Sequence, residues 1–109
     1  MMGRLYYGSS TEPFIVDDVE LAHLRMVAMT KLRRSEGFSL TLTSPSRGRS
    51  ALWVHCAIAL RFEFDAVEPL RLDPARVNEL AQAAASSAGV VLERAVEAAP
   101  ARTELAAVA

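Results

Sequence analysis

The sequence is poor in the residues from which metal sites and disulfide frameworks are built. Its 109 residues include one cysteine, one tryptophan and two histidines. A single cysteine excludes a disulfide framework and any zinc site with several cysteine ligands. His23 and His55 lie far apart along the chain, with no second histidine or cysteine at ligand spacing. We therefore expect no metal site and no cofactor.

Phosphate-binding loops, catalytic serine motifs and long apolar runs are absent as well. The five glycines stand singly, so the sequence has neither GxxxxGK[ST] nor GxGxxG, and no serine lies in GxSxG. No run of about 18 apolar residues could span a membrane. Residues 1–20 carry charged and polar side chains throughout, unlike a signal peptide. We expect a cytoplasmic protein with no membrane contact, and the sequence identifies no catalytic residue.

The residues that are present predict one small α+β domain. A length of 109 residues with 51% hydrophobic residues supports a single core. The pattern predicts a small, mainly antiparallel sheet with two helices, in the order ββαββ(β)αβ. Strands are expected over residues 3–9, 12–16, 38–43, 51–64 and 90–92, the fourth with a bend near residues 57–59. Helices are expected over residues 17–35 and 73–89.

Residue chemistry at the helix ends supports these boundaries. Asp17 is a favourable N-cap for the first helix, and Gly37 is expected to form its left-handed C-cap. Asp73 followed by Pro74 is a strong start signal for the second helix. The folded domain is expected over residues 1–92, followed by a mobile tail rich in Ala and Glu over residues 93–109.

Helical and strand periodicity also assign side chains to the core or the surface. On the first helix, the 100° spacing places His23 on the polar side and leaves Arg25 as a misfit within the apolar arc. On the long strand, Cys56 shares the parity of the apolar positions, so we expect a buried, unreactive side chain. Trp53 and His55 have the opposite parity and are expected to face away from the core.

Positive charge is concentrated in one part of a nearly neutral chain. Residues 25–50 hold six basic side chains against one acidic side chain, a net charge of +5, whereas the whole chain carries −1. The candidate polyanion-binding residues are Lys31, Arg33, Arg34, Arg47 and Arg49. Trp53 and His55, close in sequence to the loop arginines, are candidates for stacking on bases. A strand of about 20 Å separates the two basic groups, so a common surface is one alternative and two solvated groups the other.

Three stretches of the chain carry a family resemblance: GRLYYGSS, DDVELAHLRMVAMTKLRRSEGFSL and GRSALWVHCAIALRFEF. They resemble a family of short actinobacterial proteins, whose members are often labelled ATP-dependent DNA ligase and otherwise domains of unknown function. The label implies a nucleotidyltransferase that adenylates a lysine within a KxDG motif. The sole lysine of this chain, Lys31, lies within KLRR, so the ligase motifs are absent and no catalytic residue carries over.

Three hypotheses about function follow. The first is a small non-catalytic binding or interaction domain that acts on a protein partner, on itself or on a polyanion. Its edge strands and Trp53 face are suited to a homodimer. The alternative is a DNA-associated accessory domain that uses the arginine-rich residues. The third, ranked last, is an ATP-dependent DNA ligase in its own right.

Overall fold

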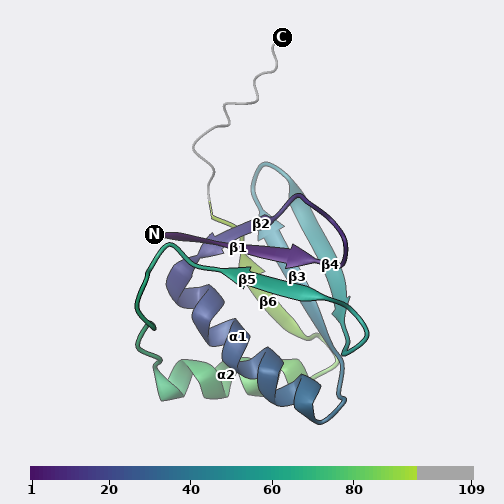
Figure 1. Cartoon of the computed structure of the whole chain (residues 1–109). Helices are drawn as coiled ribbons and strands as arrows, with labels where there is room; N and C mark the ends of the chain where they lie inside the picture. The colour runs from purple at the N-terminus through teal and green to yellow at the C-terminus, as the bar shows by residue number, and fades with distance from the viewer. Residues whose placement is uncertain (96–109) are drawn as a thin grey trace.

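The structure, a computed structural model, describes residues 1–95 as six strands and two helices (Figure 1). The α+β class and the element order predicted from the sequence are confirmed. The elements are β1 (Met2–Tyr7), β2 (Phe14–Asp17), α1 (Asp18–Arg33), β3 (Phe38–Ser44), β4 (Gly48–Val54), β5 (Leu60–Glu63), α2 (Pro74–Ala85) and β6 (Val90–Glu93).

The strands form two small sheets and not the one that the pattern predicts. One sheet has the antiparallel order β2-β1-β5, and the other has the order β4-β3-β6, in which β6 runs parallel to β3. The division follows from the break within residues 51–64, where the Ile58 amide bonds the His55 carbonyl in a turn. The chain therefore leaves one sheet as β4 and enters the other as β5.

The break also corrects the prediction for Cys56, whose side chain is exposed. Parity along a strand assigns a side chain to a face only while the backbone stays extended. Residues 55–59 turn between the two sheets, so the alternation that buries Val54 does not reach Cys56.

Helix α1 begins as predicted and ends earlier. The Asp17 carboxylate accepts hydrogen bonds from the amides of Val19 and Glu20. At the other end, the Ser35 amide bonds the Leu32 carbonyl and the Glu36 amide bonds the Lys31 carbonyl, which is a Schellman motif. The left-handed position of that motif is Ser35, with φ 59°, and not Gly37 as expected.

The core lies between α1, α2 and the two sheets. Strand β3 alternates as predicted, with Phe38, Leu40 and Leu42 buried against the helices. Figure 1 shows α1 and α2 packed against each other below the strands. The buried hydrophobic residues are Leu5, Val16, Leu21, Leu24, Val27, Ala28, Phe38, Leu40, Leu42, Val54, Leu80, Ala84, Val90 and Leu92. Among residues 1–95, no helix is both long and apolar enough to cross a membrane.

Backbone hydrogen bonds continue past the last predicted strand residue. Glu93 belongs to β6, the Arg94 amide bonds the Thr43 carbonyl, and the Ala95 amide bonds the Ile15 carbonyl. This last bond joins the end of β6 to β2 in the other sheet. The remainder of the predicted tail, residues 96–109, lies outside the described residues.

Candidate binding surfaces

The basic residues singled out from the sequence do not form one surface. Antiparallel pairing of β3 with β4 places Ser44 opposite Gly48, so the turn with Arg47 lies at the far end of β3 from α1 (Figure 1). Seven residues of strand span about 20 Å. Arg33 and Arg34 are exposed at the end of α1, where Lys31 pairs with Glu36 at 3.2 Å. The positive charge is therefore divided between two ends of the molecule.

Trp53 lies at the end of β4 that is nearer to α1, four residues along the strand from Arg49. The register pairs Trp53 with Ser39, at the start of β3. A Cβ atom on Gly37 would lie 2.8 Å from Cζ2 of Trp53, so the ring is in close contact with the glycine backbone. The Tyr7 hydroxyl donates to the Trp53 carbonyl at 2.6 Å, and 59% of the residue stays exposed. His55 is half-buried, and its Nδ1 accepts from the Ala57 amide.

One face of the sheet β4-β3-β6 does bring two of the predicted residues together. Arg49, Ala51 and Trp53 are exposed and alternate along β4 with the half-buried Ser50 and Leu52, so all three project from the outer face. Four residue steps separate Arg49 from Trp53, about 13 Å. We call this surface, completed by Ser39 and Thr41 on β3, the outer sheet face.

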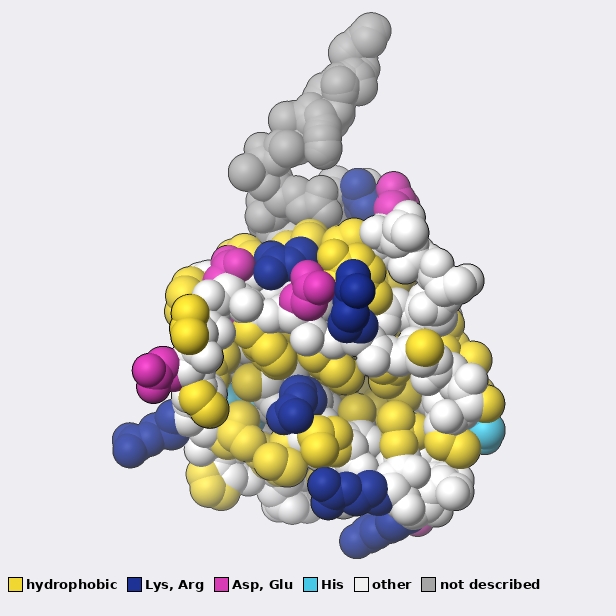
Figure 2. All heavy atoms as spheres, viewed as in Figure 1, with side chains coloured by type: hydrophobic (Ala, Val, Ile, Leu, Met, Phe, Trp, Pro, Cys, Tyr) yellow, Lys and Arg dark blue, Asp and Glu magenta, His cyan; other side chains and the backbone are white. Residues whose placement is uncertain are grey.

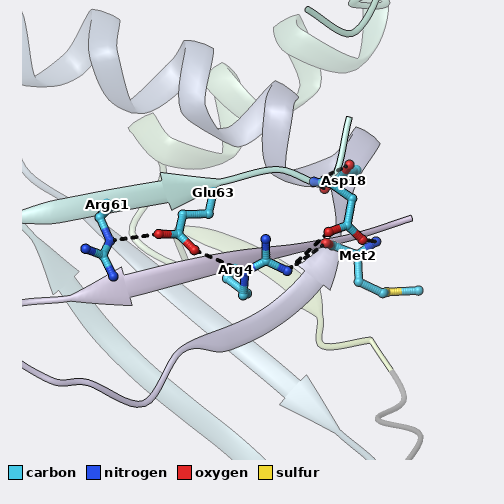
Figure 3. Close-up of polar contacts among 6 residues, drawn as sticks. Met2, Arg4, Asp18, Arg61 and Glu63 are labelled. Carbon is cyan, nitrogen blue, oxygen red and sulfur yellow. Dashed lines mark hydrogen bonds and ion pairs between the residues drawn. The ribbon is translucent and has the colours of Figure 1, made fainter. Parts of the chain in front are cut away.

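A network of ion pairs covers the other sheet (Figure 3). Arg4 pairs with Glu63 at 3.1 Å and with Asp65 at 3.4 Å, and Arg61 pairs with Glu63 at 3.3 Å. The Met2 amide, which donates to Asp65, and the Arg4 guanidinium hold the pKa of Asp65 below its ordinary value. The Glu63 carboxylate raises the pKa of Arg4 further. These charges compensate one another. The pair between Arg4 on β1 and Glu63 on β5 also ties the two strands together.

Buried polar residues hold a segment that the sequence analysis did not single out. Asp18 is 1% exposed, and its carboxylate accepts hydrogen bonds from the amides of Asp65 and Ala66. His23 is 2% exposed and not on a polar side as predicted; its Nε2 accepts from the Asp73 amide at 2.8 Å. Both side chains belong to α1, so they fix the two ends of residues 65–73. We call this segment the strap.

The geometry also settles the protonation pattern of His23. Nε2 accepts a hydrogen bond, so the proton of the neutral ring resides on Nδ1, which donates to the Val19 carbonyl at 2.7 Å. The ring thus joins the first turn of α1 to the N-cap residue of α2. Asp73 completes the junction, because its carboxylate accepts from the Ala75 amide in the first turn of α2.

The strap and α1 enclose an apolar groove of about 460 Å³, which we call the α1 groove. Figure 2 shows hydrophobic side chains gathered around a hollow on this face, with basic side chains among them. Val67 is 97% exposed at its rim, and Met26 is 37% exposed. The lining residues are Ala22, Arg25, Met26, Phe64, Ala66, Val67, Glu68, Pro69, Leu70 and Leu72.

Two opposite charges line this groove without meeting each other. Arg25 and Glu68 are both exposed, and within residues 1–95 neither side chain forms an ion pair or a hydrogen bond. Arg25 is the misfit in the apolar arc of the first helix, and most of the strap falls between the strand predicted over residues 51–64 and the helix predicted over residues 73–89. Two features of the sequence could have pointed to this groove. One is a basic residue inside an apolar helical arc, and the other is a later segment that contains Val67, Pro69 and Leu70.

Other chemistry finds little support in the part of the chain that the structure describes. Within residues 1–95, no cluster of three or more His, Cys, Asp or Glu side chains could hold a metal ion. Lys31, the residue that the ligase label would require, lies in the last turn of α1 in its pair with Glu36. We take two surfaces as candidates, the α1 groove and the outer sheet face.

Comparison with known proteins identifies a family for this chain. No curated protein and no solved structure is significantly similar to the chain. A family described as a domain of unknown function, DUF7882, matches residues 2–95, which include both candidate surfaces. The match spans all six strands and both helices. The chain therefore belongs to the DUF7882 family.

Proposed function

We propose that this chain is a non-catalytic protein-interaction domain and that it docks its partner in the α1 groove. The partner surface that fits presents an apolar side chain between one acidic and one basic group. The observation that carries the proposal is a mostly apolar groove in which Arg25 and Glu68 are exposed and unpaired. Apolar grooves that hold a few polar groups are typical of binding sites.

The anchoring of the strap supports this role. Asp18 and His23 hold the strap by backbone donors at its two ends, so the groove exists before any partner arrives. A pre-formed site avoids part of the ordering cost of association. Each large apolar side chain that a partner buries there contributes about 1.5–3 kcal/mol.

Selection of binding peptides tests the groove directly. A displayed peptide library is panned against the full chain, and selected peptides are then titrated into Met26→Lys. We expect peptides with an apolar anchor and a flanking acidic or basic residue, bound at least about tenfold more weakly by Met26→Lys. A lysine at this position places a hydrated charge against the anchor.

Val19→Lys is the matched control. Val19 lies on α1 and is 45% exposed, and it does not line the groove. The control should bind the selected peptides as the wild type does. Peptides that bind all three chains with equal affinity would contradict a docking role for the α1 groove.

A second candidate function is association with single-stranded DNA through the outer sheet face. The observation that favours it is the placement of Arg49 and Trp53 on one face of β4. An exposed aromatic ring can stack on a base while an arginine pairs with phosphate. Trp53 is the single tryptophan, so its fluorescence reports binding directly.

Titration with an oligonucleotide at low salt tests this candidate. Binding should quench Trp53 fluorescence, weaken as salt rises and fall in Arg49→Ala. Arg71→Ala, which removes the same charge from the strap, is the control and should bind unchanged. Absence of quenching at low salt, or equal binding by both variants, would exclude the outer sheet face as a DNA surface.

A further inference from the structure

Resting on the proposed function, we propose that the partner in the α1 groove is a second copy of this chain, docked about a two-fold axis. In such an interface the same patch is used by both copies, so it must be complementary to itself. The patch must therefore contain both a projecting group and a cavity, and any charge in it must have its opposite in the same patch. The α1 groove meets each of these conditions.

The projecting group is Val67, and the cavity is the groove beside it. Val67 is 97% exposed, more than any other large hydrophobic side chain of residues 1–95, and it lies on the rim of the groove that it lines. A two-fold arrangement inserts each Val67 into the groove of the other copy, against Met26 and Phe64. The remaining exposed hydrophobic residues of the helices and strands, such as Trp53 and Val91, line no part of this groove.

The charges of the groove match a second copy better than a partner of one charge sign. Arg25 on α1 and Glu68 on the strap line the same cavity and leave each other unpaired. A two-fold axis through the groove places Arg25 against Glu68 of the second copy, and Glu68 against Arg25 of that copy. A purely acidic or purely basic partner would satisfy one of these two charges and oppose the other.

This assignment moves the dimer interface away from the sheet edges expected from the sequence. The end of β6 is joined to β2 by the Ala95 amide, and the exposed positions of β4 carry Arg49 at one end. At the β6 edge, Val91 is exposed and lines a cavity, but in that cavity Arg76 already pairs with Glu20. The α1 groove combines a cavity and a projecting apolar side chain with two opposite charges that do not pair with each other.

Sedimentation of the full chain over micromolar to millimolar concentrations provides the first test. We expect a reversible dimer for the wild type. Val67→Asp should raise the dissociation constant about 100-fold, because two valines leave the interface and each contributes about tenfold. Val19→Asp, which changes an equally apolar side chain outside the groove, should dimerise as the wild type does.

Charge reversal provides a test that a folding defect cannot imitate. Arg25→Glu alone places two acids together across the axis, and Glu68→Arg alone places two bases together, so each variant should be monomeric. Mixed in equal amounts, the two variants restore both opposite-charge pairs and should form a heterodimer. Mixtures that stay monomeric while the wild type dimerises would overturn the two-fold arrangement.

The two proposals fail in different ways. The wild-type chain could be monomeric at every concentration and still bind selected peptides that Met26→Lys does not bind. That result would refute the second copy as the partner and support the α1 groove as a docking site. Peptides that dissociate the wild-type dimer would support both proposals. A dimer that Val67→Asp leaves intact would refute the interface proposed here.

Discussion

At the scale of single residues, two polar side chains of α1 determine where the strap lies. Asp18 and His23 are buried and satisfied by backbone donors more than 45 positions later in the sequence. The sequence predicted Asp17 as the N-cap, because capping is a local interaction. It placed His23 on the polar side, because helical periodicity does not reveal a partner from the strap. The hydropathy pattern of a helix does not show which of its side chains will accept hydrogen bonds from backbone amides far away in the sequence.

Removal of the Asp18 carboxylate should weaken the whole domain. Asp18→Ala leaves the amides of Asp65 and Ala66 without their acceptor, and each buried orphan donor costs about 1–3 kcal/mol. We expect the free energy of unfolding in urea to fall by about 3 kcal/mol. Asp18→Asn keeps one acceptor oxygen and should lose less. Equal losses for the two variants would show that the acceptor does not matter.

The Asp65 carboxylate should make stability depend on acidity. Its pKa is lowered in the folded chain, mainly by the Met2 amide and then by Arg4, from an ordinary value of 3.8. Its contribution is therefore complete above that ordinary value and is lost as pH falls through the lowered folded pKa. Asp65→Asn should flatten this part of the unfolding-midpoint curve. A variant curve parallel to the wild type down to strongly acidic pH would contradict the assignment.

At the scale of elements, the starts of the helices and the alternation of short strands were predictable, and the ends of the helices and the partition into sheets were not. Strand β3 shows its expected burial, and Asp73 with Pro74 begins α2 as predicted. Period-two patterning over residues 51–64 indicates extended backbone on both sides of a break. It does not say that the two halves pair with different neighbours, because pairing depends on contacts with distant strands.

The end of α1 offers a stabilising substitution. Ser35 adopts φ 59° in the Schellman motif, a conformation that costs an L-residue about 1 kcal/mol and glycine almost nothing. Ser35→Gly should raise the free energy of unfolding by about 0.5–1 kcal/mol. The same exchange at Ser50, within β4, should lower it by a similar amount. If urea titrations show that both variants change the free energy of unfolding in the same direction, this account of the helix end is refuted.

At the scale of the whole molecule, the basic segment of the sequence is not a basic face. Of the six basic side chains in residues 25–50, five lie near the end of α1 or near the β3–β4 turn, and Arg25 lines the α1 groove. Residues that are close in the sequence need not be close in the fold: the β3–β4 hairpin places its turn at the opposite end of β3 from the end of α1. The α1 groove was missed for the related reason that a strap and a helix become neighbours only in the folded chain.

The chain should not become adenylated. Lys31, the sole lysine, lies at the end of α1 and pairs with Glu36, outside the α1 groove. Incubation of the full chain with labelled ATP and a divalent cation should leave no label on the protein. A lysine-linked adduct that Lys31→Arg abolishes would refute the non-catalytic function proposed above.

The way in which the strap is held has a consequence for how this fold can diversify. The side chains of Asp18 and His23 accept hydrogen bonds from main-chain amides. Every residue except proline supplies such an amide, whatever its side chain. The residues between the anchors can therefore be exchanged without loosening either end. A designer can graft other sequences between residues 66 and 73 and retain the scaffold, much as antibody frameworks accept new loops. Two buried side chains of α1 therefore hold a connecting segment whose own sequence is free to change.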